Sequence, residues 1–197
     1  MSVSSAASRT PLPLIAGFAL FLVTIGFAVA ASVVRPSVTT YEPSPPGVPA
    51  GDAEGRVDTV TVDASDPATW RYLDLERRGV VTPPDTAGWD LAFRRHTFIA
   101  AAAVRDLGIV AWDSVARAPA GAYVATPRGR DDDDADPALA RWYDYGMLTH
   151  VLEPKANVYV VKTAEGRYAK LQILSYYCPG PRAGCPTMRY SWLGAPP

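Results

Sequence analysis

The sequence predicts a mainly β domain, built as an antiparallel sandwich or open barrel, that follows one N-terminal transmembrane α-helix. Two observations support this fold class. Between residues 57 and 192, many short runs rich in β-branched and aromatic residues are separated by turn signals such as Pro119-Ala120-Gly121. Near the N-terminus, one long stretch is apolar and uncharged. We therefore divide the chain into a cytoplasmic N-terminus (1–13), a transmembrane helix (14–34), a proline-rich linker (35–55) and a β domain (56–197).

The predicted membrane helix runs from Leu14 to Val34 and carries no charged residue. A helix of this length spans roughly 30 Å, the thickness of the hydrocarbon core of a bilayer. The sequence Ala28-Val29-Ala30 also fits a signal-peptide cleavage site. The apolar run is longer than the core of about 7–15 residues found in signal peptides, so we expect an uncleaved anchor in the lipid bilayer.

The linker, residues 35–55, is rich in proline, glycine and small residues. Such a composition cannot bury a core and favours extended, polyproline-like chain. We expect it to act as a semi-rigid spacer between the membrane and the β domain. The net charge of the whole chain is −1, which gives no reason to expect a nucleic-acid partner.

Alternation of apolar and polar residues places the strands of the β domain. In the segment Trp89–Arg95, the side chains of Trp89, Leu91 and Phe93 share one face, which we expect to face the core. The segment Phe98–Leu107 is ambiguous, and its alanines favour a short helix, as does the composition of 137–142. The other strands are expected at 57–62, 70–75, 109–112, 142–145, 148–152, 158–161 and 168–177, with a last strand ending near Trp192.

Cys178 and Cys185 are the only two cysteines, and their spacing at the end of a predicted strand favours a disulfide. Closing this short loop is expected to stabilise the fold by roughly 2–3 kcal/mol. A structural zinc site needs four ligands, and no second pair of cysteines exists, so no metal site is expected. A disulfide implies an oxidising compartment. We therefore expect a single-pass protein of the inner (cytoplasmic) membrane, with its N-terminus in the cytoplasm and its β domain in the periplasm.

The acidic run Asp131–Asp136 has two interpretations. It resembles a calcium-binding loop in charge alone, because the glycine and the distal glutamate of the twelve-residue calcium loop are missing. A solvated surface loop is the better prediction for such a block of like charges.

Several segments together resemble the HmuY family of extracytoplasmic, mainly β, haem-binding proteins. They are WDLAFRR (89–95), WDSV (112–115), RWYDYG (141–146), YVVKTAEGRYAKLQILSYYCPG (159–180) and GCPTMRY (184–190). The resemblance implies a β domain that holds haem between two axial histidine or methionine side chains. This chain differs from the family pattern in its helical anchor and in the alanine-rich stretch after His96. The family's haem ligands cannot be transferred to it through a local motif.

If the chain binds haem, its own residues restrict the choice of ligands. His96 and His150 are the only histidines, and imidazole is a common axial ligand of haem iron. His96 follows Arg94 and Arg95, which suit the haem propionates. His150 alternates with Leu148 and Leu152, which predicts a position on the apolar face of a strand. Met147 and Met188 are substitute ligands, although methionines in strands more often fill the core.

The sequence contains no G-x-S-x-G, P-loop or H-E-x-x-H motif, and we expect no enzymatic activity. Two functions follow from the remaining features. The first is a non-catalytic subunit without a cofactor, which scaffolds a membrane protein complex through its helix and its extracytoplasmic domain. A photosynthetic reaction-centre and light-harvesting assembly is a specific example. The alternative function is haem binding of the HmuY type at the membrane surface.

Overall fold

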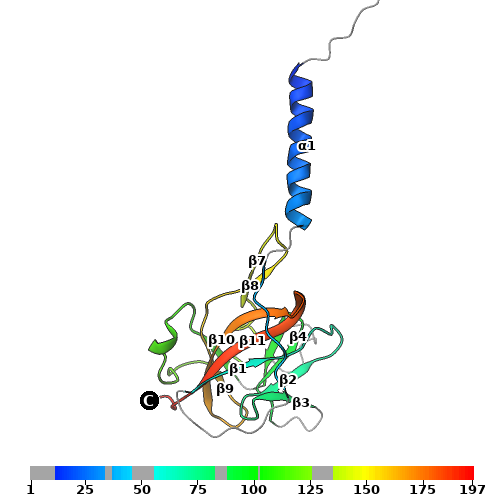
Figure 1. Ribbon diagram of the computed structural model, residues 1–197. Coiled ribbons are helices and arrows are strands. Elements are labelled where there is room, and N and C mark those ends of the chain that lie inside the picture. Colours follow the sequence, from blue (N-terminus) through cyan, green and yellow to red (C-terminus); the bar gives the residue numbers. More distant parts are fainter. Residues whose placement is uncertain (1–11, 34–36, 46–55, 83–87, 102, 126–134) are drawn as a thin grey trace, which may run out of the picture. The chain divides into compact units, whose positions relative to one another are not determined.

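The computed structural model describes residues 12–33, 37–45, 56–82, 88–101, 103–125 and 135–197 (Figure 1). These residues belong to two units. One consists of the N-terminal segment through Ser37 together with the loop Gly146–Val151, and the other consists of Val38–Tyr145 and Leu152–Pro197. The second unit contains the β domain.

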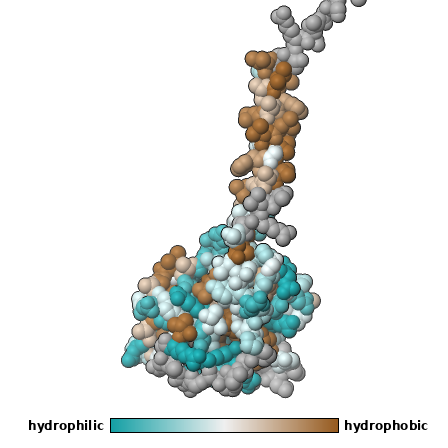
Figure 2. All heavy atoms as spheres, in the orientation of Figure 1, coloured by the Kyte–Doolittle hydropathy of each residue, from teal (hydrophilic) through white to brown (hydrophobic). Residues whose placement is uncertain are grey.

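The first unit contains helix α1, Leu12–Val33, which confirms the predicted helix with its ends one or two residues earlier. Within the described part of the chain, it is the one helix long and apolar enough to cross a membrane. Its surface is hydrophobic along its length (Figure 2). The hydroxyl of Thr24 donates to the carbonyl of Leu20 at 2.9 Å, so this polar group is satisfied within the helix.

Two antiparallel sheets form the β domain, as the sequence predicts. The five-stranded sheet has the order β1 (Val57–Thr61), β11 (Arg182–Leu193), β10 (Tyr168–Cys178), β9 (Tyr159–Lys162) and β6 (Ala103–Asp106). The four-stranded sheet has the order β3 (Gly79–Val81), β2 (Arg71–Asp74), β4 (Leu91–Arg94) and β5 (Thr97–Ala100). A separate hairpin consists of β7 (Tyr143–Tyr145) and β8 (Leu152–Pro154).

The main core contains residues of both large sheets, among them Leu73, Phe93, Leu171 and Tyr190. A second apolar cluster forms where Val115 and Ala118, from the segment between β6 and β7, pack with Val158, Val160 and Leu193. The strand β9 is consequently buried on both of its faces. This burial explains why its sequence is almost continuously apolar rather than alternating.

The predicted helix at Phe98–Leu107 is wrong, because this segment forms β5 and β6. Pairing of β5 with β4, and of β6 with β9, satisfies its backbone groups. The side chains of Phe98 and Ala100 are buried in the core, so tertiary packing overrides the helical preference of alanine. The strand predicted at 109–112 is also wrong, since the structure has a single 3₁₀ turn at Trp112–Ser114. Residues 137–140 form turns and not a helix.

The first part of the predicted linker belongs to the β domain and is not a spacer. Thr40 forms a parallel bridge with Tyr177, and the hydroxyl of Ser175 donates to the carbonyl of Thr39. The N–H of Ser44 donates to the carbonyl of Thr61 at 2.9 Å, and the N–H of Thr61 donates to the Ser44 hydroxyl at 2.9 Å. These bonds fix residues 39–44 along the sheet. Residues 46–55 of the predicted linker lie outside the described residues.

Candidate functional site

Arg94, Arg95 and His96 lie at the tight turn between β4 and β5. The two strands pair in register up to Arg94 and Thr97, so Arg95 and His96 alone make the turn. Arg95 adopts a φ of +52°, in the left-handed region that tight hairpin turns require. Its N–H donates to the carbonyl of Ala64 at 3.0 Å, which attaches the turn to the segment after β1. The imidazole of His96 is exposed.

A cluster of aromatic side chains packs against this turn. The indole N–H of Trp142 donates to the carbonyl of His96 at 3.0 Å. The Trp142 ring is buried and stacks on Phe98, with centroids 4.8 Å apart and an angle of 8° between the rings. Tyr143 meets the His96 ring edge-on, with centroids 6.3 Å apart. The position of the imidazole is therefore set by aromatic residues that lie more than forty positions later in the chain.

Arg94 and Arg95 also interact with aromatic residues. The guanidinium carbon of Arg94 lies 4.6 Å from the centre of the Trp70 ring, a cation–π contact. Arg95 interacts with the hydroxyl of Tyr176. Burial raises the pKa of Tyr176 to about 12, and the charge of Arg95 opposes this rise. Tyr176 therefore remains a neutral hydrogen-bonding group. We call Arg94, Arg95, His96, Trp142, Tyr143 and Tyr176 the β4–β5 corner.

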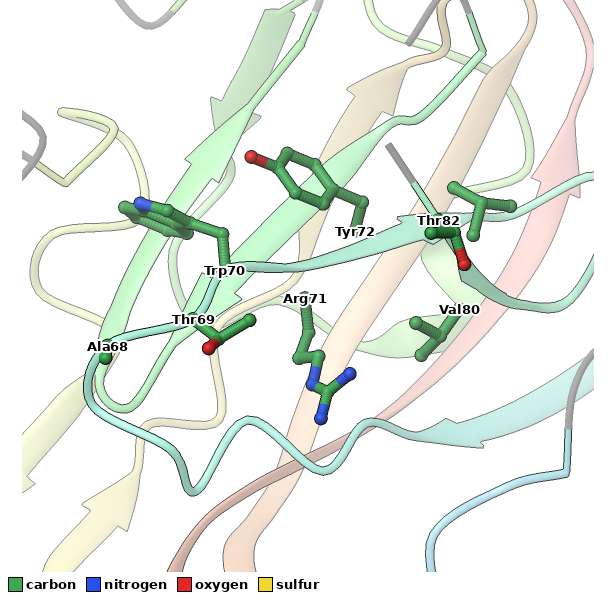
Figure 3. A pocket seen from close by; sticks show the side chains of 8 residues that line it. Ala68, Thr69, Trp70, Arg71, Tyr72, Val80 and Thr82 are labelled. Carbon is green, nitrogen blue, oxygen red and sulfur yellow. The ribbon is translucent and has the colours of Figure 1, made fainter. Parts of the chain in front are cut away.

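A surface hollow of about 340 Å³ lies beside Trp70, which precedes β2, and Tyr72 of β2. Trp70 and Tyr72 point to one side of the strand, and Arg71 points to the other (Figure 3). The edge strand β3 contributes Val80 to the lining. The Arg94–Trp70 contact connects this hollow with the β4–β5 corner.

His150 does not lie on the apolar face of a strand, so this prediction is wrong. Residues 147–149 form a turn, His150 follows it with a φ of +54°, and β8 begins only at Leu152. The N–H of Gly146 donates to the carbonyl of Val151 at 2.8 Å, and the N–H of His150 donates to the carbonyl of Gly146 at 2.7 Å. These bonds close a hairpin loop in which the side chain of His150 is exposed.

The two methionines proposed as substitute ligands have different environments. Met188 is buried in the main core, where it fills space between the sheets. Met147 lies in the hairpin loop with His150 and is exposed. The loop belongs to the first unit, and the β4–β5 corner belongs to the second.

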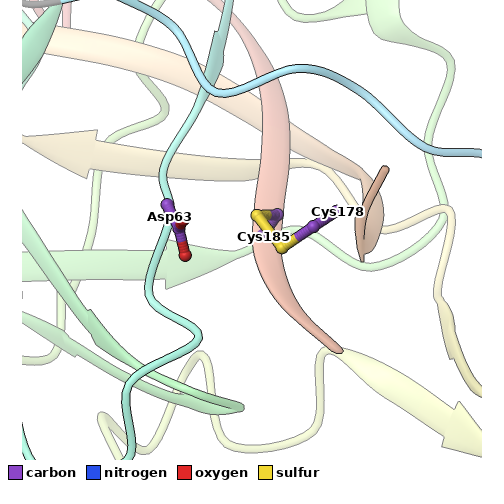
Figure 4. A group of neighbouring side chains, drawn as sticks. All are labelled: Asp63, Cys178 and Cys185. Atoms are coloured by element: carbon purple, nitrogen blue, oxygen red, sulfur yellow. A yellow bond between two sulfur atoms is a disulfide. The ribbon is translucent and has the colours of Figure 1, made fainter. Parts of the chain in front are cut away.

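Cys178 and Cys185 form the predicted disulfide across the β10–β11 hairpin. The carboxylate of Asp63 lies near the two sulfur atoms (Figure 4). It accepts hydrogen bonds from the N–H and the hydroxyl of Ser65, and the hydroxyl bond is the main reason that its pKa lies below the usual value. Because both sulfur atoms are used in the disulfide, this group cannot act as a thiolate metal site.

Of the acidic run, Asp136 is described and Asp131–Asp134 lie outside the described residues. Asp136 is buried, contrary to the prediction of a solvated loop. Its carboxylate accepts from the N–H of Ala138 at 2.9 Å, and its N–H donates to the carbonyl of Phe98 at 2.8 Å. This residue therefore attaches the turn before Trp142 to β5.

The β4–β5 corner combines three chemical groups suited to a planar, anionic metallomacrocycle. An exposed imidazole can ligate iron, guanidinium groups can pair with carboxylates, and aromatic rings can pack against a macrocycle. The donor set therefore fits haem. Sequence reasoning identified the first two groups but missed Trp70, Trp142 and Tyr176. An enrichment of tryptophan and tyrosine around residues 141–145 and 176–177 was the available signal.

Comparisons with known proteins give the family and the fold. A family model described as HmuY protein matches residues 66–190. A protein described as a lipoprotein from Bacteroides fragilis NCTC 9343 has a TM-score of 0.59 at 20% identity, covering 74% of this chain and 94% of its own. The apo HmuY analogue of Tannerella forsythia has a TM-score of 0.59 at 16% identity, covering 72% and 99%. A protein of Bacteroides vulgatus ATCC 8482, described as HmuY-like and haem-binding, has a TM-score of 0.54 at 22% identity, covering 68% and 91%. No curated protein matches the chain.

Proposed function

The chain belongs to the HmuY family, and from this premise we propose that it binds haem outside the cytoplasm while α1 anchors it in the membrane. One observation carries the proposal. The β4–β5 corner presents an exposed imidazole beside two guanidinium groups, and the buried ring of Trp142 is hydrogen-bonded to the same turn. The description of a structural neighbour as HmuY-like and haem-binding supports the same class of ligand.

His96, Arg94, Arg95 and Trp142 of the corner have proposed roles. When bound, haem would supply an iron atom that takes nitrogen or sulfur ligands. His96 would ligate this iron, and Arg94 and Arg95 would pair with the propionates. Trp142 positions the turn by its hydrogen bond to the carbonyl of His96. The cation–π contact with Trp70 holds the guanidinium of Arg94 near the surface of the domain.

The proposal that His150 ligates haem iron, with Met147 as the substitute, rests on the sequence alone. Both belong to the exposed hairpin loop Gly146–Val151. This assignment is separate from that of His96 and is tested separately.

The proposed location follows from the disulfide and from α1. A disulfide persists in an oxidising compartment, which supports a periplasmic β domain and a cytoplasmic N-terminus. We propose that α1 remains on the mature protein as a single-pass anchor of the inner membrane. Resistance of the chain to alkaline carbonate extraction from membranes would support the anchor, and release into the soluble fraction would contradict it.

The scaffold function predicted from the sequence receives less support than haem binding. The family and its structural neighbours point toward haem, and no observation favours a photosynthetic complex. A partner membrane complex stays a prediction.

Absorption spectroscopy of the full chain in mild detergent tests the proposal. Addition of ferric haem is expected to give the spectrum of a six-coordinate, low-spin complex. The substitution His96→Ala should abolish this spectrum, and His150→Ala should convert it to a five-coordinate one. Arg117→Gln, which removes an exposed arginine outside the corner, is the matched control and should leave the spectrum unchanged. An unaltered spectrum in both histidine variants would contradict the proposal.

A further inference from the structure

The loop between β7 and β8 exposes large apolar side chains at its tip. Met147 is 76% exposed and Leu148 is 70% exposed, and Tyr145 at the end of β7 is 48% exposed. No charged residue occurs from Tyr145 to Leu152. Apolar side chains gathered on one exposed loop are typical of a surface that contacts another apolar surface.

The hairpin that carries this tip is held in a defined shape. Tyr143–Tyr145 pairs with Leu152–Pro154 in register, and the N–H of Lys155 donates to the carbonyl of Trp142 at 2.8 Å. The N–H of Leu152 donates to the hydroxyl of Tyr177 at 2.8 Å. The base of the hairpin is therefore attached to β10 through Tyr177.

Tyr177 also forms a β-bridge with Thr40, in the segment that follows α1. Helix α1 ends at Val33, and Thr39 and Thr40 are already bound to Ser175 and Tyr177 of β10. The peptide steps from Val33 to Thr39 span at most about 20 Å. The chain therefore reaches the part of β10 that holds the hairpin base after a short connection from α1. The tip loop and the segment through Ser37 also belong to the same unit.

We propose that the β7–β8 tip, formed by Tyr145, Met147 and Leu148, inserts into the headgroup region of the bilayer that holds α1. The partner is the lipid surface itself. Tyrosine is favoured at this depth, and methionine and leucine bury apolar area at the boundary of the acyl chains. This second contact would orient the β domain on the membrane. The inference rests on the anchoring role of α1 in the proposed function.

Fluorescence quenching by spin-labelled lipid tests the inference on the full chain reconstituted in phosphatidylcholine vesicles. Both native cysteines are used in the disulfide, so a cysteine introduced by Leu148→Cys carries the only reactive thiol for a fluorophore. A nitroxide near the headgroup should reduce its emission roughly twofold, as expected for a residue at the interface. The matched control is Ile109→Cys, since Ile109 is apolar and 78% exposed but lies outside the hairpin. Its emission should not change.

A second label keeps the native tip intact. Thr149→Cys should be quenched to a similar degree, and adding Met147→Asp and Leu148→Asp should remove that quenching. Equal emission from the labels at 148, 149 and 109 would overturn the inference. Carbonate extraction of the same vesicles separates the two failures. A chain that stays with the vesicles without quenching contradicts only the tip contact, whereas a released chain contradicts the anchor and the tip contact together.

Discussion

Asp90 should make the stability of the β domain depend on pH in a direction opposite to that of an ordinary paired carboxylate. Its side chain is 1% exposed, and it accepts hydrogen bonds from the N–H of Leu75 at 2.8 Å and of Ala164 at 2.9 Å. Burial raises the pKa of Asp90 from 3.8 to about 6, although these two bonds oppose the rise. The nearby carboxylates of Glu165 and Asp74 raise it further.

The sign of the effect follows from proton linkage. The folded state holds the proton of Asp90 more tightly than the unfolded state, so folding is favoured by protonation. This stabilisation is complete below the unfolded pKa of 3.8 and is lost as the pH rises through about 6. The whole difference amounts to about 3 kcal/mol. About 1 kcal/mol of it should appear between pH 7 and pH 5.

Urea unfolding of the full chain in detergent, followed by tryptophan fluorescence, measures this effect. The free energy of unfolding of the wild type should increase on acidification relative to that of Asp90→Asn, in which the side chain cannot ionise. Asp66→Asn is the contrasting control, because backbone hydrogen bonding to Ala68 lowers the pKa of Asp66 and its contribution is lost on acidification. Parallel pH profiles for the wild type and Asp90→Asn would refute the reasoning.

Three further predictions follow from single contacts. Trp142→Phe keeps the aromatic stack but removes the bond to the His96 carbonyl, so it should cost about 1 kcal/mol in urea unfolding and weaken haem binding severalfold. Cys185→Ser opens the disulfide and should cost about 2–3 kcal/mol, measured by thermal unfolding against the oxidised wild type. Gly184→Ala should destabilise more than Gly166→Ala, because its φ is +112° and an added Cβ would lie 2.5 Å from a backbone atom, whereas Gly166 has open space. Equal melting temperatures for the two glycine variants would contradict the structural reason.

Local sequence patterns predict the elements whose side chains alternate or whose composition is uniform. Helix α1, β1, β2, β4, β9 and β10 were expected from apolar periodicity, and they occur within a few residues of their predicted ends. The pairing of the two cysteines was also predictable, because the sequence has only two and they lie seven residues apart. The resemblance to the HmuY family, carried by scattered motifs, gave the correct fold.

Contacts between distant segments account for what the sequence could not show. The alanines of 100–103 favour a helix in isolation, and only pairing with β4 and β9 makes β5 and β6. The hydrogen bond between Ser175 and Thr39 joins residues more than a hundred positions apart and makes an expected spacer part of the sheet. His96 and Trp142 lie far apart in sequence, so the aromatic support of the candidate site has no local signature.

The affinity of the full chain for ferric haem, compared with that of His96→Ala, tests the central claim most directly. Competition against a haem-binding protein of known affinity gives both dissociation constants under the same detergent conditions. We predict that His96→Ala weakens binding by about tenfold or more, while its urea unfolding remains that of the wild type because the side chain is exposed. An unchanged dissociation constant in a folded His96→Ala protein would contradict the assignment of the β4–β5 corner as the haem site.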